Sequence, residues 1–204
     1  MGMRGDELRE HILHVAKNVI LEMGFERASM DVIASRAETS KRTLYAHFEN
    51  KEKLYLAVIE LVRGYFLNKL KRPSDYPGEP AEALALFCGR FLEILLYGPT
   101  IRMCRLSVAE VTRFPEGSAK YFDVIFNETH VRLSDYLKVT FKLSAEASLE
   151  AAQQLLGRVI LPRFTRALFG IDGLTEQMDP DALRADFDLK PIRRAVAELM
   201  KSMA

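Results

Sequence analysis

The sequence has 204 residues, and 49% of them are hydrophobic, which is enough to bury a core as one large domain or as a small domain joined to a larger one. Its 29 Lys and Arg residues nearly balance its 28 Asp and Glu residues, which excludes a globally basic nucleic-acid binder and an acidic disordered chain. Any DNA-binding surface must therefore be local. The two cysteines and four histidines show no metal-ligand spacing, so we expect no metal, no cofactor and a cytoplasmic protein. No uncharged run reaches the roughly 18 residues of a membrane helix.

Apolar residues recur at helical spacing over residues 8–23, which predicts a first helix. Ser29 is a hydroxyl N-cap for a short second helix, and Thr39 with Ser40 offers a cap for a third helix that runs to Phe48. The three helices are short and a tight turn separates the last two. This layout is that of a helix-turn-helix module, although three-helix units also occur as plain packing elements inside enzymes.

The rest of the chain also has helical periodicity. Asn50 is the cap candidate for a long fourth helix that continues towards Leu70, and the stretch 72–80, with three prolines and a glycine, is predicted to be a loop. No segment alternates in the manner of a strand, so we predict an all-α protein of about nine helices. The later helices are expected at about 81–97, 100–112, 115–141, 145–169 and 191–203.

The exposed face of the third helix has the chemistry of a major-groove reader. With Leu44 and Phe48 directed inward, the opposite face holds hydrogen-bond donors and one small residue that permits close approach, and no carboxylate. Nearby acids leave only a modest local excess of positive charge. The residues of this face are Lys41, Arg42, Thr43, Ala46 and His47.

Two stretches, GFERASMDVIA at 24–34 and SKRTLYAHFENKEKL at 40–54, resemble the DNA-binding signature of the TetR family. This resemblance covers roughly the first quarter of the chain. It implies a transcriptional regulator that binds palindromic, double-stranded operator DNA as a homodimer. It also implies a helix-turn-helix domain at 1–53 and a ligand-binding and dimerisation domain at 54–204.

The resemblance further implies a role for each matching position. Hydroxyls, a phenol and helix N-termini are expected to contact phosphates, whereas the outer face of the third helix is expected to contact base edges. Arg42 is the strongest candidate, because its planar guanidinium can pair with guanine O6 and N7. Phosphate contacts are expected from Ser29, Ser40, Tyr45 and Lys51, base contacts from Arg42, Thr43 and His47, and either kind from Lys41, with Thr39 completing the DNA-binding set.

The sequence departs from the family pattern in the turn and on the recognition helix. Many members have glycine at the position of Glu38, so we expect a non-glycine residue at positive φ here, at a cost of about 1 kcal/mol or more. Many members also have glycine at the position of Arg42. That difference adds a base contact and makes operator sequences from relatives unreliable guides.

The effector is predicted to be an unknown small molecule of apolar or amphipathic character. Aromatic and aliphatic side chains of the larger domain are candidates to line its pocket, although each by itself is more commonly plain core. Three polar side chains on otherwise apolar helices, Arg102, Arg105 and His130, could orient an anionic or amphipathic ligand. The candidate lining residues are Phe91, Leu95, Arg102, Met103, Phe122, Phe126, His130 and Phe164.

Small residues near Gly157, together with the final helix, resemble the family's four-helix dimer interface, and Pro162 is expected to kink its helix or shift its register. The leading hypothesis is a repressor that a small molecule releases from DNA. An activator, a ligand-independent regulator and a helical small-molecule-binding protein without a DNA role remain alternatives. No enzyme is predicted, because the sequence contains no catalytic residue set, and Cys88 and Cys104 are interpreted as small buried hydrophobes.

Overall fold

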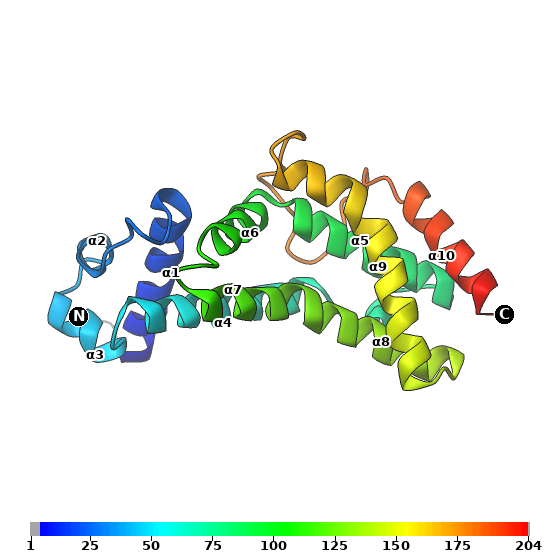
Figure 1. The fold of residues 1–204 in the computed structure, drawn as a ribbon, viewed down its shortest axis with the longest axis horizontal. Coiled ribbons are helices and arrows are strands. Elements are labelled where there is room, and N and C mark those ends of the chain that lie inside the picture. Colours follow the sequence, from blue (N-terminus) through cyan, green and yellow to red (C-terminus); the bar gives the residue numbers. More distant parts are fainter. Residues whose placement is uncertain (1–4, 204) are drawn as a thin grey trace. The chain divides into compact units, whose positions relative to one another are not determined.

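The computed structural model describes residues 5–203, and its elements are almost entirely helical (Figure 1). Within this range there is no β-strand beyond an isolated bridge between Tyr97 and Thr175. The elements are α1 (Gly5–Met23), α2 (Met30–Arg36), α3 (Lys41–His47), α4 (Lys51–Lys69), the 3-10 turn η1 (Pro73–Asp75), α5 (Pro80–Leu96), α6 (Gly98–Ala109), α7 (Pro115–Phe122), the π-helical turn η2 (Asp123–Asn127), α8 (Glu128–Phe141), α9 (Ala145–Leu168) and α10 (Lys190–Ser202).

The all-α prediction is confirmed. Because α7, η2 and α8 follow one another without a break, they form one long helix, and the described chain then has nine. Helix ends lie close to the predicted ones, except that α6 stops at Ala109 rather than near residue 112. Prolines lie in the first turns of α5, α6, α7 and α10, where a missing amide hydrogen costs little. Helix α9 continues through Pro162.

The chain divides into two compact units that do not follow chain order. Unit 1 contains the residues up to Tyr65 together with Arg102–Phe122, and unit 2 contains Phe66–Ile101 and the residues from Asp123 onward. The helix-turn-helix domain expected at 1–53 lies within unit 1, which is larger because it includes the first part of α4 and a segment from the middle of the chain. None of the helices within 5–203 combines the length and apolar character required to span a bilayer.

Unit 1 is centred on the buried face of α1 and on a cluster of three aromatic rings. The Phe25 ring lies 5.0 Å from that of Tyr55 and 5.7 Å from that of Phe114, measured between ring centroids. Beside this cluster, Arg113 donates to Glu26 at 2.6 Å. This ion pair holds the segment after α6 against the loop before α2. The two residues are more than 80 positions apart in the sequence, so no local sequence pattern predicts their contact.

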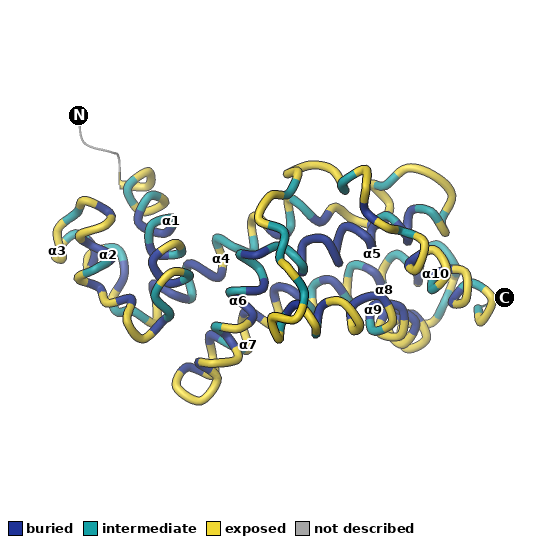
Figure 2. Tube along the Cα trace, turned by 90° about the horizontal axis from the view of Figure 1, so that it is seen from above, coloured by how far each residue is buried: buried dark blue, intermediate teal, exposed yellow. Residues whose placement is uncertain are grey.

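Helix α5 forms the centre of unit 2. Its residues are buried almost all round, as Figure 2 shows along its trace, and it packs against α9, α10 and η1. A helix that is buried on all sides has apolar residues on all of its faces rather than in one stripe. The exceptions are Arg90 and Glu93, which are both buried and lie one turn apart.

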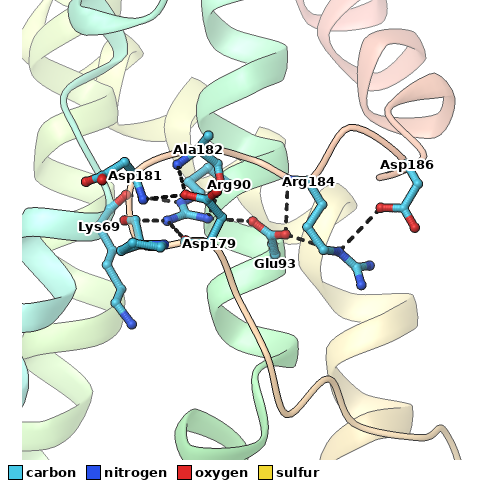
Figure 3. Close-up of polar contacts among 9 residues, drawn as sticks. Lys69, Arg90, Glu93, Asp179, Asp181, Ala182, Arg184 and Asp186 are labelled. Carbon is cyan, nitrogen blue, oxygen red and sulfur yellow. Dashed lines mark hydrogen bonds and ion pairs between the residues drawn. The ribbon is translucent and has the colours of Figure 1, made fainter.

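The guanidinium of Arg90 joins three segments of unit 2 (Figure 3). It is 1% exposed and donates to the Glu93 carboxylate at 2.7 Å, while Arg184 forms an ion pair with the same carboxylate at 3.3 Å. Burying an arginine is costly unless its donors find acceptors, and here the remaining donors bond to backbone carbonyls. These carbonyls belong to Lys69 at the end of α4 and to Asp179, Pro180 and Ala182 in the loop before α10.

Candidate DNA-binding site

The α2–turn–α3 module begins each of its helices at a serine cap. The Ser29 hydroxyl oxygen accepts from the Val32 amide at 3.2 Å, and the Ser40 hydroxyl oxygen accepts from the Thr43 amide at 3.0 Å. These bonds satisfy amides that have no partner inside their own helix. The caps predicted at Ser29 and Ser40 are therefore confirmed.

Helix α3 presents two distinct faces. Leu44 and the following Phe48 are buried, which anchors the helix on unit 1. On the opposite side Arg42 is exposed and Tyr45 is 50% exposed. His47 is half-buried. Of the exposed side chains on this face, Lys41, Arg42 and Tyr45 carry hydrogen-bond donors, and Ala46 carries none.

The two lysines of the site differ in their availability. Lys41 forms an exposed ion pair with Asp31 at 2.6 Å, and exposed pairs of this kind contribute little to stability. The Lys51 ammonium donates to the Glu26 carbonyl at 3.0 Å and lies 4.3 Å from the centroid of the Phe25 ring. Burial lowers the pKa of Lys51 from its ordinary value. The phosphate contact expected from Lys51 stays a prediction, and it requires that ammonium to leave these partners.

The start of α4 has a cap of its own. The side-chain oxygen of Asn50 accepts from the Lys53 amide at 2.8 Å, as the sequence predicts for a helix that begins here. The turn before α3 has the unusual backbone expected from the missing glycine, because Glu38 has φ of +51°. A side chain in this left-handed region crowds the following carbonyl, so the turn stores strain.

Replacing Glu38 by glycine should therefore stabilise unit 1 by about 0.5–1 kcal/mol, since glycine adopts positive φ without the steric penalty but loses more entropy on folding. Thermal unfolding followed by circular dichroism measures the effect. Glu38→Ala is the matched control, because it removes the charge and keeps the strain. If alanine raises the midpoint as much as glycine does, the gain comes from charge and not from the backbone.

The candidate ligand-pocket residues fall into two sets. In unit 2, the rings of Phe91 and Phe126 are 6.4 Å apart and those of Phe126 and Phe164 are 5.8 Å apart, both in edge-on geometry. His130 hydrogen-bonds to the Phe126 carbonyl through Nδ1 at 2.7 Å, and Leu95 is buried on α5. The other three candidates, Arg102, Met103 and Phe122, belong to unit 1, where Phe122 is 52% exposed.

Comparison with known families covers both parts of the chain. A family model described as bacterial regulatory proteins of the tetR family matches residues 12–58, and one described as the C-terminal domain of an AefR-like transcriptional repressor matches residues 82–186. The chain belongs to the TetR family. It is a transcriptional regulator with an N-terminal helix-turn-helix and a helical C-terminal domain.

Individual relatives agree most strongly in the DNA-binding part. The transcriptional activator FasR of Mycolicibacterium smegmatis is 47% identical over 55 residues, which are 27% of this chain and 25% of that protein. The regulator QacR of Staphylococcus aureus is 31% identical over 65 residues, which are 32% of this chain and 35% of that protein. These matches thus span well under half of each relative's length.

Solved structures match over the full chain. The flavonoid-responsive regulator FrrA superimposes with a TM-score of 0.74 at 25% identity, covering 97% of this chain and 95% of its own. A TetR-family regulator from Mesorhizobium loti superimposes with a TM-score of 0.70 at 18% identity, covering 99% and 97%. The helical fold of this TetR-family protein is thus shared over both of its units.

Sequence reasoning missed some of the polar contacts that position this site. The Lys51–Glu26 bond and the Arg113–Glu26 ion pair each join segments distant in sequence, and no spacing rule signals them. For Arg90 and Glu93 a signal existed, because two opposite charges one turn apart on an otherwise apolar helix indicate a buried pair.

Proposed function

We propose that this TetR-family regulator is a repressor that binds a palindromic operator as a homodimer and leaves it when a small-molecule effector binds the C-terminal domain. The observation that carries the proposal is the α2–turn–α3 module, whose capped helices present exposed donors opposite a buried Leu44 face. Such a protein acts in the cytoplasm, where it meets its operator.

In this proposal the module divides its contacts between backbone and bases. The hydroxyls of Ser29, Ser40 and Tyr45 donate to phosphates and set the position of α3, while Arg42 and His47 face the base edges. Thr43 lies with Ser40 at the start of α3, its hydroxyl 2.8 Å from that of Ser40. Each phosphate neutralised by a cation adds about 0.9 to the salt dependence of binding, so a dimer gains affinity from few contacts per subunit.

The second copy of the chain is proposed to pack on α9 and α10. The outward face of α9 has a shallow groove of about 450 Å³ lined by Gly157, Leu161, Pro162 and neighbouring polar residues. The Leu161 side chain is 59% exposed. Beside it, Arg158 of α9 forms an ion pair with Glu198 of α10 at 2.5 Å. An apolar side chain beside a glycine allows close helix packing across a two-fold axis.

Replacing Leu161 by glutamate should convert the dimer to monomer, because four-helix packing would bury the new charge without a partner. The fold should survive, since the Leu161 side chain is exposed in the single chain. Size-exclusion chromatography with light scattering gives the mass. Val139→Glu on α8 is the control, as Val139 is even more exposed at 79% and lies off the α9 face. A Leu161→Glu protein that stays dimeric would place the interface elsewhere.

The effector is proposed to contact the three aromatic rings of Phe91, Phe126 and Phe164, with His130 beside them as a polar group. Aromatic edges and faces suit planar or apolar ligands. Two structural neighbours carry names that fit this chemistry, a flavonoid-responsive regulator and a fatty acid degradation regulator. The ligand shifts the population only by its greater affinity for the state that does not bind DNA.

Binding to the chain's own promoter region tests the proposal. Purified protein mixed with that duplex at low ionic strength should retard it in a gel, and competitor duplex of random sequence should not displace the complex. Absence of binding, or a monomeric protein, would overturn the assignment. An activator is the second candidate, because the relative FasR is named as one. Deleting the gene raises expression of the target under repression and lowers it under activation.

A further inference from the structure

A second pocket of unit 2 lies between the turn η1 and helix α8, and none of the aromatic residues proposed for the effector lines it. Its volume is about 390 Å³, within the range of roughly 300–1,000 Å³ that small-molecule sites occupy. One wall is residues 72–74 of the loop after α4. The other wall consists of α8 residues spaced three or four apart from Arg132 to Thr140, which form one face of that helix.

The loop wall of this η1–α8 pocket is held in place from both ends. Arg72 has extended backbone angles before Pro73, and its amide donates to the Asp75 carboxylate at 3.0 Å. Pro73 is buried, and the Tyr76 ring lies edge-on to that of Phe87 on α5, with the centroids 6.2 Å apart. The wall is therefore formed before any ligand arrives, which lowers the entropy that binding costs.

Each wall contributes an arginine. On α8, Arg132 donates to the Leu70 carbonyl, so its guanidinium is kept near the start of the loop. On the loop, Arg72 is exposed, and its guanidinium has no hydrogen bond or ion pair with any residue from 5 to 203. Guanidinium groups present planar sets of donors that match the oxygens of a carboxylate or a phosphate. Two of them at one pocket favour an oxyanion.

The acids near this pocket do not cancel the two arginines. The Asp75 carboxylate is occupied by the Arg72 amide and by the Ser74 hydroxyl, and it does not line the pocket. Asp135, which is exposed on α8, is the one carboxylate among the lining residues that the structure describes. Two cations thus face one anion, and the excess of positive charge attracts a negatively charged ligand.

The pocket also has an apolar part. The Tyr136 ring is half-buried and Val139 is 79% exposed, and both line the same wall as Arg132. An inorganic anion would leave these two side chains uncovered, whereas a ligand with an apolar body would remove their surface from water. The lining therefore suits an organic anion better than a bare phosphate.

We propose that the η1–α8 pocket binds a small organic oxyanion, a carboxylate or a phosphate ester, whose charged group pairs with Arg72 and Arg132. The apolar body of this ligand covers Tyr136 and Val139. The site is separate from the aromatic cluster proposed for the effector, and its occupation requires neither operator DNA nor that effector.

Calorimetric titration of the full chain at low ionic strength, in a chloride buffer without other oxyanions, tests the proposal. The probes are benzoate and phenyl phosphate, with benzamide as the neutral analogue of benzoate. At least one of the two anions should bind with a Kd below about 10 mM, and benzamide should not bind in this range. The anion that binds more tightly identifies the ligand as a carboxylate or as a phosphate ester.

Three variants locate the binding. Arg72→Gln should weaken the anion at least about tenfold, because a charge-assisted hydrogen bond is lost, and it should fold normally since Arg72 is exposed. Arg194→Gln, at an exposed position of α10, is the matched control and should bind as the parent protein does. Asp135→Asn should tighten binding by about two- to fivefold, because it removes the acid that repels the ligand.

Failure of both anions to bind would overturn the proposal. So would unchanged binding in Arg72→Gln, which would place the anion elsewhere on the chain, and so would equal weakening in Arg72→Gln and Arg194→Gln, which would indicate a general effect of net charge. Benzamide binding as tightly as benzoate would show that the oxyanion is not recognised. None of these titrations contains DNA, so their outcome is independent of the gel retardation that decides the proposed function.

Discussion

Replacing Arg42 by alanine should weaken operator binding by the dimer by about 2–6 kcal/mol, since each bidentate contact with guanine contributes about 1–3 kcal/mol and a homodimer loses two. The fold should be unchanged, because Arg42 is exposed and forms no ion pair within residues 5–203. Fluorescence anisotropy with a labelled operator duplex measures the loss, and circular dichroism verifies the fold.

The pattern of the loss distinguishes a base reader from a phosphate contact. Arg42→Ala should relax the preference at one base pair of each half-site, whereas Tyr45→Ala should weaken all sequences about equally. Lys138→Ala, which removes an exposed cation from α8, is the matched control and should leave affinity unaltered. If Arg42→Ala binds the operator with unchanged affinity, Arg42 does not contact the bases. If Arg42→Ala and Tyr45→Ala both bind with unchanged affinity, this face of α3 is not the DNA-binding surface.

Replacing Arg90 by methionine should destabilise unit 2 by about 3–5 kcal/mol, the cost of leaving one partner of a buried ion pair without the other. Methionine fills similar volume but donates no hydrogen bond, so the Glu93 carboxylate loses its 2.7 Å partner and four backbone carbonyls lose their donor. Urea unfolding followed by circular dichroism gives the change in the unfolding midpoint.

Two further variants locate the origin of that effect. The double variant Arg90→Met with Glu93→Leu should recover part of the stability, because it also removes the buried carboxylate that Arg90→Met leaves with the half-exposed Arg184 as its one remaining charged partner among the described residues. Arg166→Met breaks an exposed pair with Asp172 at 2.9 Å and should leave the midpoint nearly unchanged. If Arg90→Met and Arg166→Met have the same urea unfolding midpoint, the buried Arg90–Glu93 pair contributes no more to the stability of unit 2 than an exposed ion pair does.

Local features of this protein followed from the sequence alone. The helices and the serine caps at Ser29 and Ser40 depend on residues within about four positions along the chain, whereas the positive φ of Glu38 was expected from the resemblance to the TetR family. The inward direction of Leu44 follows from the same short spacing. Backbone hydrogen bonding and side-chain periodicity over one or two turns are sufficient to specify them.

Contacts between distant segments decided the rest. The Lys51 ammonium bonds to the Glu26 carbonyl, Arg90 bonds to the Asp179 carbonyl, and the segment 102–122 belongs to the same unit as α3. The two bonded pairs are separated by 25 and 89 residues along the chain. The sequence offers many other residues of similar charge and size that could equally serve as partners. Only the folded arrangement selects among them, because the free energy of burial and of ion pairing depends on which side chains lie within a few ångströms in space.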